Sequence, residues 1–273
     1  MHPPTTNHLN HLIIVCCHAI YKRGPTNGAS EDEWIIEPFQ KGETPTFTAH
    51  VVTGLRLAAE DPHALLVFSG GPTKQDRTSL AEGESYFNLA KDNAFFNLTP
   101  SISSSSTTSL TTRITTENHA TDSHQNLLFS LLKFRSVTAR YPTRITVVTH
   151  EFKRARFLEV HFPALGLGKR VDGGGVEMRV VGINPPPDVT PLEVLVEGEE
   201  KGGIGVWRGD RYGSGCVLGG KRVRRGWDEG SVYEVLRGLE GEEGEVVGAL
   251  VRWDGGLSGN QLFEGMEGLP WYS

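Results

Sequence analysis

The stretch LLVFSGGPTKQDRTSLAEGESYF, residues 65–87, decides the fold class of this chain. Its apolar start predicts a buried strand, Ser69-Gly70-Gly71 predicts a sharp turn, and a helix is expected from the polar residues that follow. Paired glycines let the backbone turn tightly and approach a ligand closely at the carboxyl end of a strand. We therefore expect Gly70 and Gly71 to lie beside a bound ligand.

The same order of strand, polar loop and helix recurs at residues 114–132 and 145–161. Further strands are expected at residues 11–17 and 176–183. Repeated crossovers of this kind build a parallel sheet whose loops gather on one edge, where open α/β folds bind ligands. The sequence thus predicts an α/β fold with a doubly wound, mostly parallel sheet of about five strands in the order 3-2-1-4-5.

The chain has 273 residues, which is long enough to bury a full core. We expect an α/β domain over residues 1–190, interrupted at 97–112 by a serine- and threonine-rich surface insertion. Residues 191–273 are rich in glycine and are expected to form a small appendage, which either packs on this domain or trails from it. Helices are expected in the appendage at residues 232–239 and 245–253.

The composition, with 37% hydrophobic and 22% charged residues, is ordinary for a soluble globular protein. A formal net charge of −6 argues against a nucleic-acid partner, in spite of the basic segment 221–225. No apolar window approaches the length of a membrane span, so no membrane partner is expected. Three cysteines, two of them adjacent (Cys16 and Cys17), are too few for a disulfide framework and indicate a reducing compartment. These features predict a cytoplasmic protein.

Three carboxylates are expected at the ligand-binding edge as candidates for catalysis, namely Glu82, Glu117 and Asp122. Glu82 could act as a general base, although the sequence from Ser79 to Glu82 also matches a capping box, which is purely structural. Glu117 ends the third strand, where a carboxylate points into the crevice, and Asp122 with Gln125 matches a helix cap. Together the three could hold Mg²⁺, which takes oxygen ligands, or could be three unrelated structural residues.

Other residues at this edge are candidates for ligand binding. Ser123 and Asn126 fall in the first turn of the predicted helix, where free backbone N–H groups attract anions. Thr149 and Arg156 belong to the segment THEFKRAR that follows a strand directly, and a guanidinium there can clamp a carboxylate or phosphate. His18 ends the first strand and could contact a polar ligand, although a lone histidine is more often part of a structural hydrogen-bond network.

Several familiar motifs do not occur in the sequence. No Gly-x-Gly-x-x-Gly follows the first strand, and no phosphate loop ends in Gly-Lys-Ser/Thr. The spacing of cysteine and histidine residues does not indicate zinc. Classical dinucleotide-dependent dehydrogenases and P-loop hydrolases are therefore disfavoured.

Taken together, these motifs resemble those of the domain-of-unknown-function family 218, which includes the bacterial proteins SanA, ElyC and YdcF. The resemblance is carried by the following residues in order: Ser69-Gly70-Gly71, Glu82, Glu117, Asp122-Ser123, Asn126, Val147-Val148-Thr149, Phe152 and Arg156. The closer resemblance is to the eukaryotic, especially fungal, branch of the family. It extends to CCHAIY at 16–21, FQKGE at 39–43, GINPP at 182–186 and LPW at 269–271. In the bacterial members His-Met precedes the arginine of the fourth-strand motif, where this chain has Lys153-Arg154.

The resemblance implies a Rossmann-like α/β/α sandwich with a polar pocket at the strand ends. YdcF binds S-adenosylmethionine, so the resemblance also implies this cofactor as one candidate ligand. The sequence therefore predicts an intracellular protein that binds a small polar or nucleotide-like ligand, and it leaves open whether the protein is an enzyme. Two alternatives are a metal-assisted hydrolase or phosphatase, and a non-catalytic interaction protein that uses the glycine-rich appendage.

Overall fold

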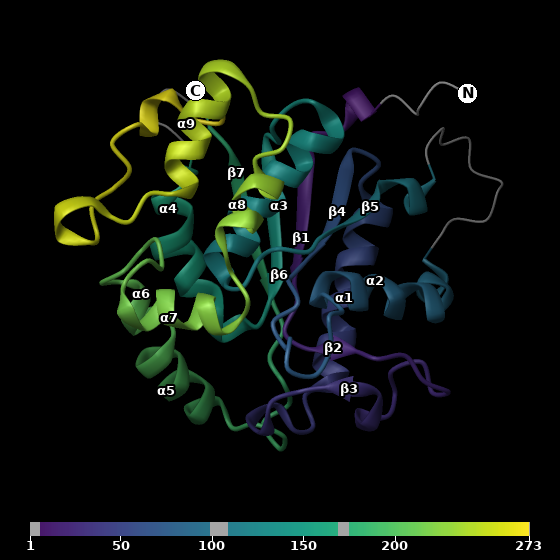
Figure 1. Cartoon of the computed structure of the whole chain (residues 1–273). Coiled ribbons are helices and arrows are strands. Elements are labelled where there is room, and N and C mark those ends of the chain that lie inside the picture. The colour runs from purple at the N-terminus through teal and green to yellow at the C-terminus, as the bar shows by residue number, and fades with distance from the viewer. Residues whose placement is uncertain (1–5, 99–108, 169–174, 273) are drawn as a thin grey trace.

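A five-stranded parallel sheet forms the centre of the molecule, with the strands in the order β5-β4-β1-β6-β7 (Figure 1). The computed structural model describes residues 6–98, 109–168 and 175–272. In chain order the sheet strands therefore lie 3-2-1-4-5, and the predicted topology is confirmed. The strands are β1 (His11–Cys16), β4 (Ala64–Ser69), β5 (Ile114–Glu117), β6 (Arg144–Thr149) and β7 (Glu177–Gly182).

The central strands are buried along their whole length, which explains their continuous apolar sequences. Every residue of β1 and of β4 is buried. Ile14 of β1 lies opposite Val67 of β4 and Val147 of β6 in the parallel ladders. Strands with hydrophobic side chains on both faces are stable only where helices cover both faces of the sheet.

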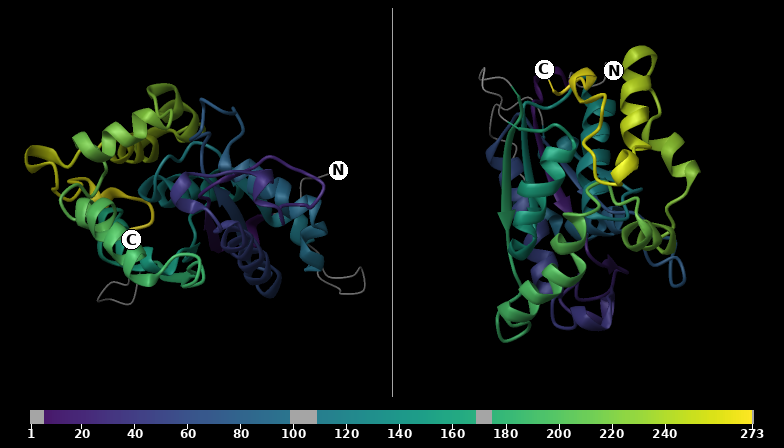
Figure 2. Two further views of the ribbon diagram at one scale, coloured as in Figure 1. Left: turned by 90° about the horizontal axis from the view of Figure 1, so that it is seen from below. Right: turned by 90° about the vertical axis from the view of Figure 1, so that its left-hand side faces the viewer.

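Helices cover the two faces and complete the three layers of a Rossmann-like fold (Figure 2). On one face, α1 (Thr44–Glu60) and α2 (Glu82–Asp92) share a core with Ile13 and Val15 of β1. On the other face, α3 (Ser123–Thr138) and α4 (Phe162–Ala164) share a core with Leu12 and Ile14. Alternate residues of one strand therefore serve the two cores, as the two-residue period of a strand requires.

Asp122 begins α3 as the sequence predicts, because its carboxylate accepts a hydrogen bond from the backbone N–H of Gln125 at 2.9 Å. The capping box expected between Ser79 and Glu82 is wrong. The helix α2 begins at Glu82 itself, and its N-cap residue Ala81 has no side-chain cap. The backbone N–H of Glu82 donates to the Gly71 carbonyl at 3.1 Å, so the turn after β4 fixes the start of this helix.

Two segments contain secondary structure that differs from the sequence-based expectation, one after β6 and one after β1. The helix expected at residues 151–161 is a 3₁₀ turn, η6 (Glu151–Lys153), followed by the π-helical segment η7 (Arg156–His161). The long segment after β1 contains the antiparallel pair β2 (Ile20–Tyr21) and β3 (Trp34–Ile35).

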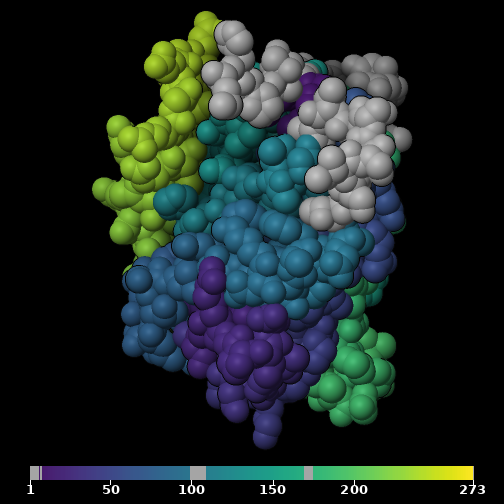
Figure 3. All heavy atoms as spheres, turned by 90° about the vertical axis from the view of Figure 1, so that its right-hand side faces the viewer, coloured from purple at the N-terminus to yellow at the C-terminus, as the bar shows by residue number. Residues whose placement is uncertain are grey.

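The N-terminal half of the chain forms most of the face shown in Figure 3, with the C-terminal helices visible at one edge in yellow-green.

Residues after 190 form five helices in the described part of the chain: α5 (Leu192–Gly202), α6 (Ile204–Trp207), α7 (Cys216–Arg224), α8 (Glu229–Val235) and α9 (Gly241–Val251). This segment packs on the α3 side of the sheet and does not trail away from it. Val247, Phe263 and Trp271 belong to the same hydrophobic core as α3. The Trp271 indole N–H donates to the Leu165 carbonyl at 2.7 Å. The domain boundary near residue 190 stays a prediction.

Part of the predicted surface insertion, residues 99–108, lies outside the described residues. Its end forms a 3₁₀ turn, η5 (Leu110–Arg113), whose Leu110 is buried against the core beneath α1 and α2. None of the helices in the described ranges is both long and apolar enough to cross a membrane.

Candidate functional site

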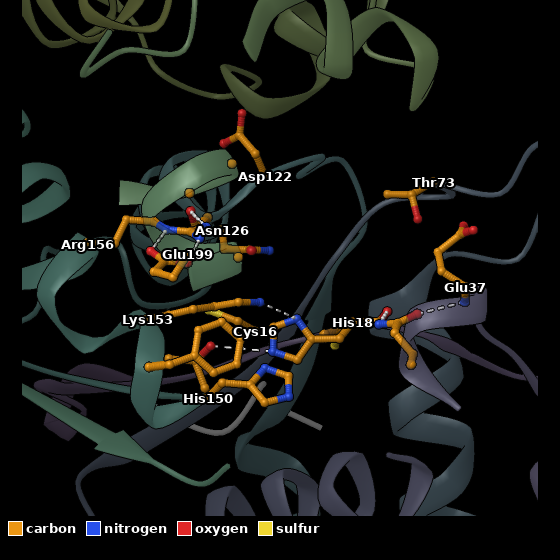
Figure 4. A pocket seen from close by; sticks show the side chains of 18 of the residues that line it. Cys16, His18, Glu37, Thr73, Asp122, Asn126, His150, Lys153, Arg156 and Glu199 are labelled. Carbon is orange, nitrogen blue, oxygen red and sulfur yellow. Dashed lines mark hydrogen bonds and ion pairs between the residues drawn. The ribbon is translucent and has the colours of Figure 1, made fainter. Parts of the chain in front are cut away.

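A cavity of about 480 Å³ opens at the carboxyl edge of the sheet. Its wall combines residues that follow β1 and β6, the first turn of α3, and side chains from α5, α6 and α7. In Figure 1 these elements surround the lower end of the sheet, and Figure 4 shows the side chains that converge there. The volume falls in the range of about 300–1,000 Å³ that is typical of small-molecule sites.

Most of the residues that the sequence places at this edge line the cavity. They are His18, Glu82, Asp122, Ser123, Asn126, Thr149 and Arg156. They come from four separate stretches of the chain, so the fold brings together what the topology predicts. Gly70, Gly71 and Glu117 do not belong to the lining.

Gly70 and Gly71 do not line the cavity, and they allow the loops at the carboxyl edge of the sheet to pack closely. Their backbone N–H groups donate to the carbonyls of Glu117, at 3.0 Å, and Ala120, at 2.7 Å. A Cβ atom at Gly70 would lie 2.8 Å from the Cβ of Glu82. The glycines therefore let the turn after β4 approach the loop after β5 and the start of α2, and their approach to a ligand stays a prediction.

Glu117 is buried and binds the protein's own backbone. Its carboxylate accepts hydrogen bonds from the Ser69 hydroxyl and from the backbone N–H groups of His119, at 2.6 Å, and Ala120, at 3.0 Å. Burial raises the pKa of Glu117 to about 7. Asn126 joins this network, because its amide donates to the Ser69 carbonyl at 3.0 Å and to the Ser69 hydroxyl at 2.9 Å. The network ties β4, β5 and α3 together beneath the cavity.

Asp122 lines the cavity, but both of its carboxylate oxygens have partners in the protein. One oxygen caps α3, and the other accepts from Arg222 of α7 at 2.6 Å. Burial raises the pKa of Asp122, but the charge of the Arg222 guanidinium and its hydrogen bond oppose this effect, and the net shift is downward. Asp122 thus connects the first turn of α3 to the C-terminal helices.

Glu82 faces the cavity and accepts a hydrogen bond from the Thr73 hydroxyl. Burial raises its pKa, against the opposing effect of that hydrogen bond. Glu82, Glu117 and Asp122 thus have three different sets of partners. Within the described ranges, no group of three or more His, Cys, Asp or Glu residues is placed to hold a metal ion.

Arg156 reaches the cavity as expected, but a carboxylate of α5 already occupies its guanidinium. The Arg156 Nε donates to Glu199 Oε1 at 2.8 Å, and a second nitrogen pairs with Glu199 Oε2. A third nitrogen donates to the Ser123 hydroxyl at 3.1 Å, which also contacts His161 Nε2 at 2.8 Å. This bidentate arrangement is the one by which a guanidinium binds a carboxylate ligand.

Three further cations line the cavity, and the sequence analysis did not single them out. Lys153 Nζ lies 3.4 Å from His18 Nδ1, Lys221 donates to the Gly202 carbonyl at 3.1 Å, and Arg225 donates to the Thr121 carbonyl at 2.6 Å. No carboxylate in the described part of the chain lies within 4.0 Å of these three cations. The basic runs around 153 and 221–225 are the only sequence signals that could have indicated them.

Neighbouring charges and burial act on the two lysines. The pKa of Lys153 is lowered to about 8, first by burial and then by the charge of Arg156. The pKa of Lys221 is also lowered, by burial and by the nearby Arg225. By contrast Lys74, on the opposite wall, forms an ion pair with Glu37. One side of the cavity therefore carries cations that crowd one another.

Beneath Lys153 lies a group of histidines, His18, His50 and His150. The ring centroids of His18 and His150 are 4.4 Å apart, and those of His50 and His150 are 4.9 Å apart. Burial lowers the pKa of all three rings, and the charge of Lys153 lowers it further. The rings are therefore uncharged near neutral pH, and His18 and His150 line the cavity as polar but neutral groups.

Two of the three cysteines also line the cavity. Cys16 and Cys17 are buried at the end of β1, whereas Cys216 is exposed at the start of α7. Burial raises the pKa of Cys16 to about 12 and raises that of Cys17 as well. Both buried thiols therefore stay protonated, which makes them poor nucleophiles.

The fold and the site define a Rossmann-like α/β protein with a ligand-sized cavity at the carboxyl edge of its sheet. The chain is 26% identical over 265 residues to "Uncharacterized protein YOR238W" of Saccharomyces cerevisiae, and the alignment covers 81% of this chain and 86% of the yeast protein. No protein-family model matches the chain. No solved structure matches it either.

Proposed function

We propose that this protein binds a small polar molecule with an anionic group, such as a carboxylate or a phosphate, in the cavity at the carboxyl edge of the sheet. We also propose that it is a relative of the domain-of-unknown-function family 218. S-Adenosylmethionine, which has a carboxylate and a nucleoside, is then the first ligand to test.

One observation carries the proposal: Lys153, Lys221 and Arg225 line the same cavity without a carboxylate in ion-pair distance among the described residues. Three other ionic side chains of the wall have ion-pair partners. Arg156 is paired with Glu199, Lys74 with Glu37, and Asp122 with Arg222. Lys153 and Lys221 are partly removed from water and have no carboxylate in ion-pair distance among the described residues, so they favour an anion that supplies one.

The pKa shifts indicate the same chemistry. The positive charges of Arg156 and Arg225 lower the pKa of Lys153 and of Lys221, respectively. A bound anion would oppose this repulsion and raise both pKa values, so binding should take up protons near pH 8.

The most direct experiment is mass spectrometry of small molecules that are released when the purified protein is denatured. We expect an anionic polar compound that is present in about equimolar amount. In parallel, S-adenosylmethionine, adenosine monophosphate and inorganic phosphate should be tested by calorimetric titration. A protein that releases no such compound, and whose melting temperature none of the three probes changes, would contradict the proposal.

A matched pair of variants locates the binding to this cavity. Lys221→Met removes a cation of the cavity wall, and we expect it to weaken binding of an anionic ligand at least tenfold, because a charge-assisted hydrogen bond contributes about 1.5–3 kcal/mol. Lys201→Met is the control, since Lys201 lies on the exposed side of α5 and pairs with Glu197. Titration of both variants should show full affinity in the control, and equal losses in the two would place the ligand elsewhere.

A further inference from the structure

We propose that Lys153 forms a covalent imine with a carbonyl compound bound in the cavity, so that the ligand class is an aldehyde or ketone with an anionic group. The proposal rests on the binding function proposed above, and it adds a nucleophile and a substrate class to it.

The position of Lys153 is the first observation. It ends the 3₁₀ turn η6, a few residues after β6, and it lines the cavity at the carboxyl edge of the sheet. In Figure 4 its side chain extends across the cavity between Arg156 and His18. A nucleophile at this place meets a ligand whose anionic group is held by the cations of the same wall.

The surroundings of Lys153 differ from those of the other two lysines of the wall. The Lys74 ammonium is paired with the Glu37 carboxylate. Lys221 donates to a backbone carbonyl at the rim of the cavity. Among the described residues, Lys153 has a neutral imidazole as its hydrogen-bond partner. After burial, the like charge of Arg156 lowers its pKa most, against the opposing effect of the Glu199 carboxylate. A lysine amine that is desolvated beside another cation is activated as a nucleophile.

His18 orients the amine. Its Nδ1 lies 3.4 Å from Lys153 Nζ, and its Nε2 lies 3.4 Å from the Thr149 hydroxyl. A neutral His18 that accepts from Lys153 at Nδ1 has its proton on Nε2, from which it donates to Thr149. The contact therefore holds Nζ on the cavity side of η6 without adding a negative charge. His18 is thus a positioning residue for Lys153.

The chemical step balances with the groups at hand. The neutral amine of Lys153 adds to the carbonyl carbon, which forms the C–N bond. The carbonyl C–O bond then breaks, and both amine protons leave with the oxygen as water, which yields Lys153–N=C. The pKa of about 8 leaves roughly a tenth of the side chain in the reactive neutral form at pH 7.

The test uses glyoxylate, a small aldehyde with a carboxylate, together with sodium cyanoborohydride, which reduces an imine to a stable amine. The full chain is treated at pH 7, digested, and analysed by mass spectrometry to locate each modified lysine. We expect Lys153 to be labelled at least about tenfold faster than Lys74, which is paired with Glu37, because the pKa of Lys153 lies well below the ordinary value of 10.5 and each unit of pKa changes the neutral fraction tenfold. The labelling rate of Lys153 should be half-maximal near pH 8.

Calorimetric titration of the wild type with a non-carbonyl anion, adenosine monophosphate, measures the binding function separately from the imine. The variant Lys153→Arg tests the nucleophile, because it keeps a cation in the wall but cannot form an imine. We expect the label to vanish from this position. Labelling that follows only the exposure of each lysine, or a half-maximal rate for Lys153 near pH 10.5, would overturn the imine even where anion binding persists. A wild-type protein that does not bind the anion would instead overturn the proposed function.

Discussion

At the scale of single residues, the tertiary structure around a carboxylate decides whether it lines the ligand cavity or holds neighbouring loops together. Glu117 ends a strand at the ligand-binding edge, yet it binds Ser69 and two backbone N–H groups and lies outside the cavity lining. Glu82 matches a local capping pattern, yet it faces the cavity and binds Thr73. The sequence places both residues at the carboxyl edge of the sheet, but the packing of the loops determines which of them faces the cavity.

The raised pKa of Glu117 makes stability depend on pH. Its pKa rises from an ordinary value of 4.5 to about 7 in the folded protein, so the folded state binds the proton more tightly than the unfolded state. The resulting stabilisation is complete below about pH 4.5 and is lost as pH rises through 7, by up to about 3 kcal/mol. Glu117→Gln should remove this dependence, as measured by urea unfolding at pH 5 and pH 8.

The matched control for this prediction is Glu84→Gln, on the exposed side of the neighbouring helix α2. It should keep the pH dependence of the wild type. If Glu117→Gln and the wild type lose equal stability between pH 5 and pH 8, Glu117 is not the group that titrates.

At the scale of secondary-structure elements, short-range patterns predict helix α3 well and helix α2 poorly. Asp122 and Gln125 lie in one turn, so their cap is visible in the sequence and is confirmed. The start of α2 depends on Gly70 and Gly71, whose carbonyls accept from its first two residues, at 2.8 Å from Gly83 and 3.1 Å from Glu82. A contact over more than ten residues leaves no local pattern, so the capping motif nearby was misleading.

The close approach at Gly70 can be tested directly. Gly70→Ala should destabilise the protein by about 1–3 kcal/mol, because the new Cβ would lie 2.8 Å from Glu82 Cβ and 3.1 Å from Cys17 Cβ. Gly198→Ala is the control on helix α5, where no atom lies within 4 Å of the added Cβ. That change should raise the free energy of unfolding by about 0.5–1 kcal/mol, since alanine favours a helix over glycine. Equal effects of the two substitutions in urea unfolding would contradict the packing role of Gly70.

At the scale of the whole molecule, sequence predicts the sheet and its ligand-binding edge but not the full wall of the cavity. The order of the five strands follows from continuous apolar runs separated by helices, which are local signals. Glu199, Lys221 and Arg225 come from a glycine-rich region without clear periodicity, and they reach the cavity only because α5–α7 pack against α3 and η7. These residues lie far along the chain from the strand ends, so no local sequence motif indicates that they line the cavity.

If the C-terminal helices are part of one cooperative unit, disrupting their last anchor should lower the stability of the whole chain. Trp271→Ala removes a buried indole that packs against Tyr141 with ring centroids 5.0 Å apart, and we expect a loss of about 3–5 kcal/mol. Unfolding should still follow a single transition by fluorescence and by circular dichroism. Leu257→Ala, at a fully exposed position of the same segment, should leave stability unchanged. Two separate transitions in the wild type would show that residues after 190 unfold independently.

The unequal exposure of the three cysteines provides a way to observe the cavity. Cys16 and Cys17 are buried with protonated thiols, whereas Cys216 is exposed at the first position of α7. A maleimide dye should therefore attach to Cys216 alone in the native protein, without any engineered cysteine. Because Leu218 and Lys221 of the same helix line the cavity, the dye would sit within two turns of the wall. Its fluorescence would give a direct titration signal for any compound that enters.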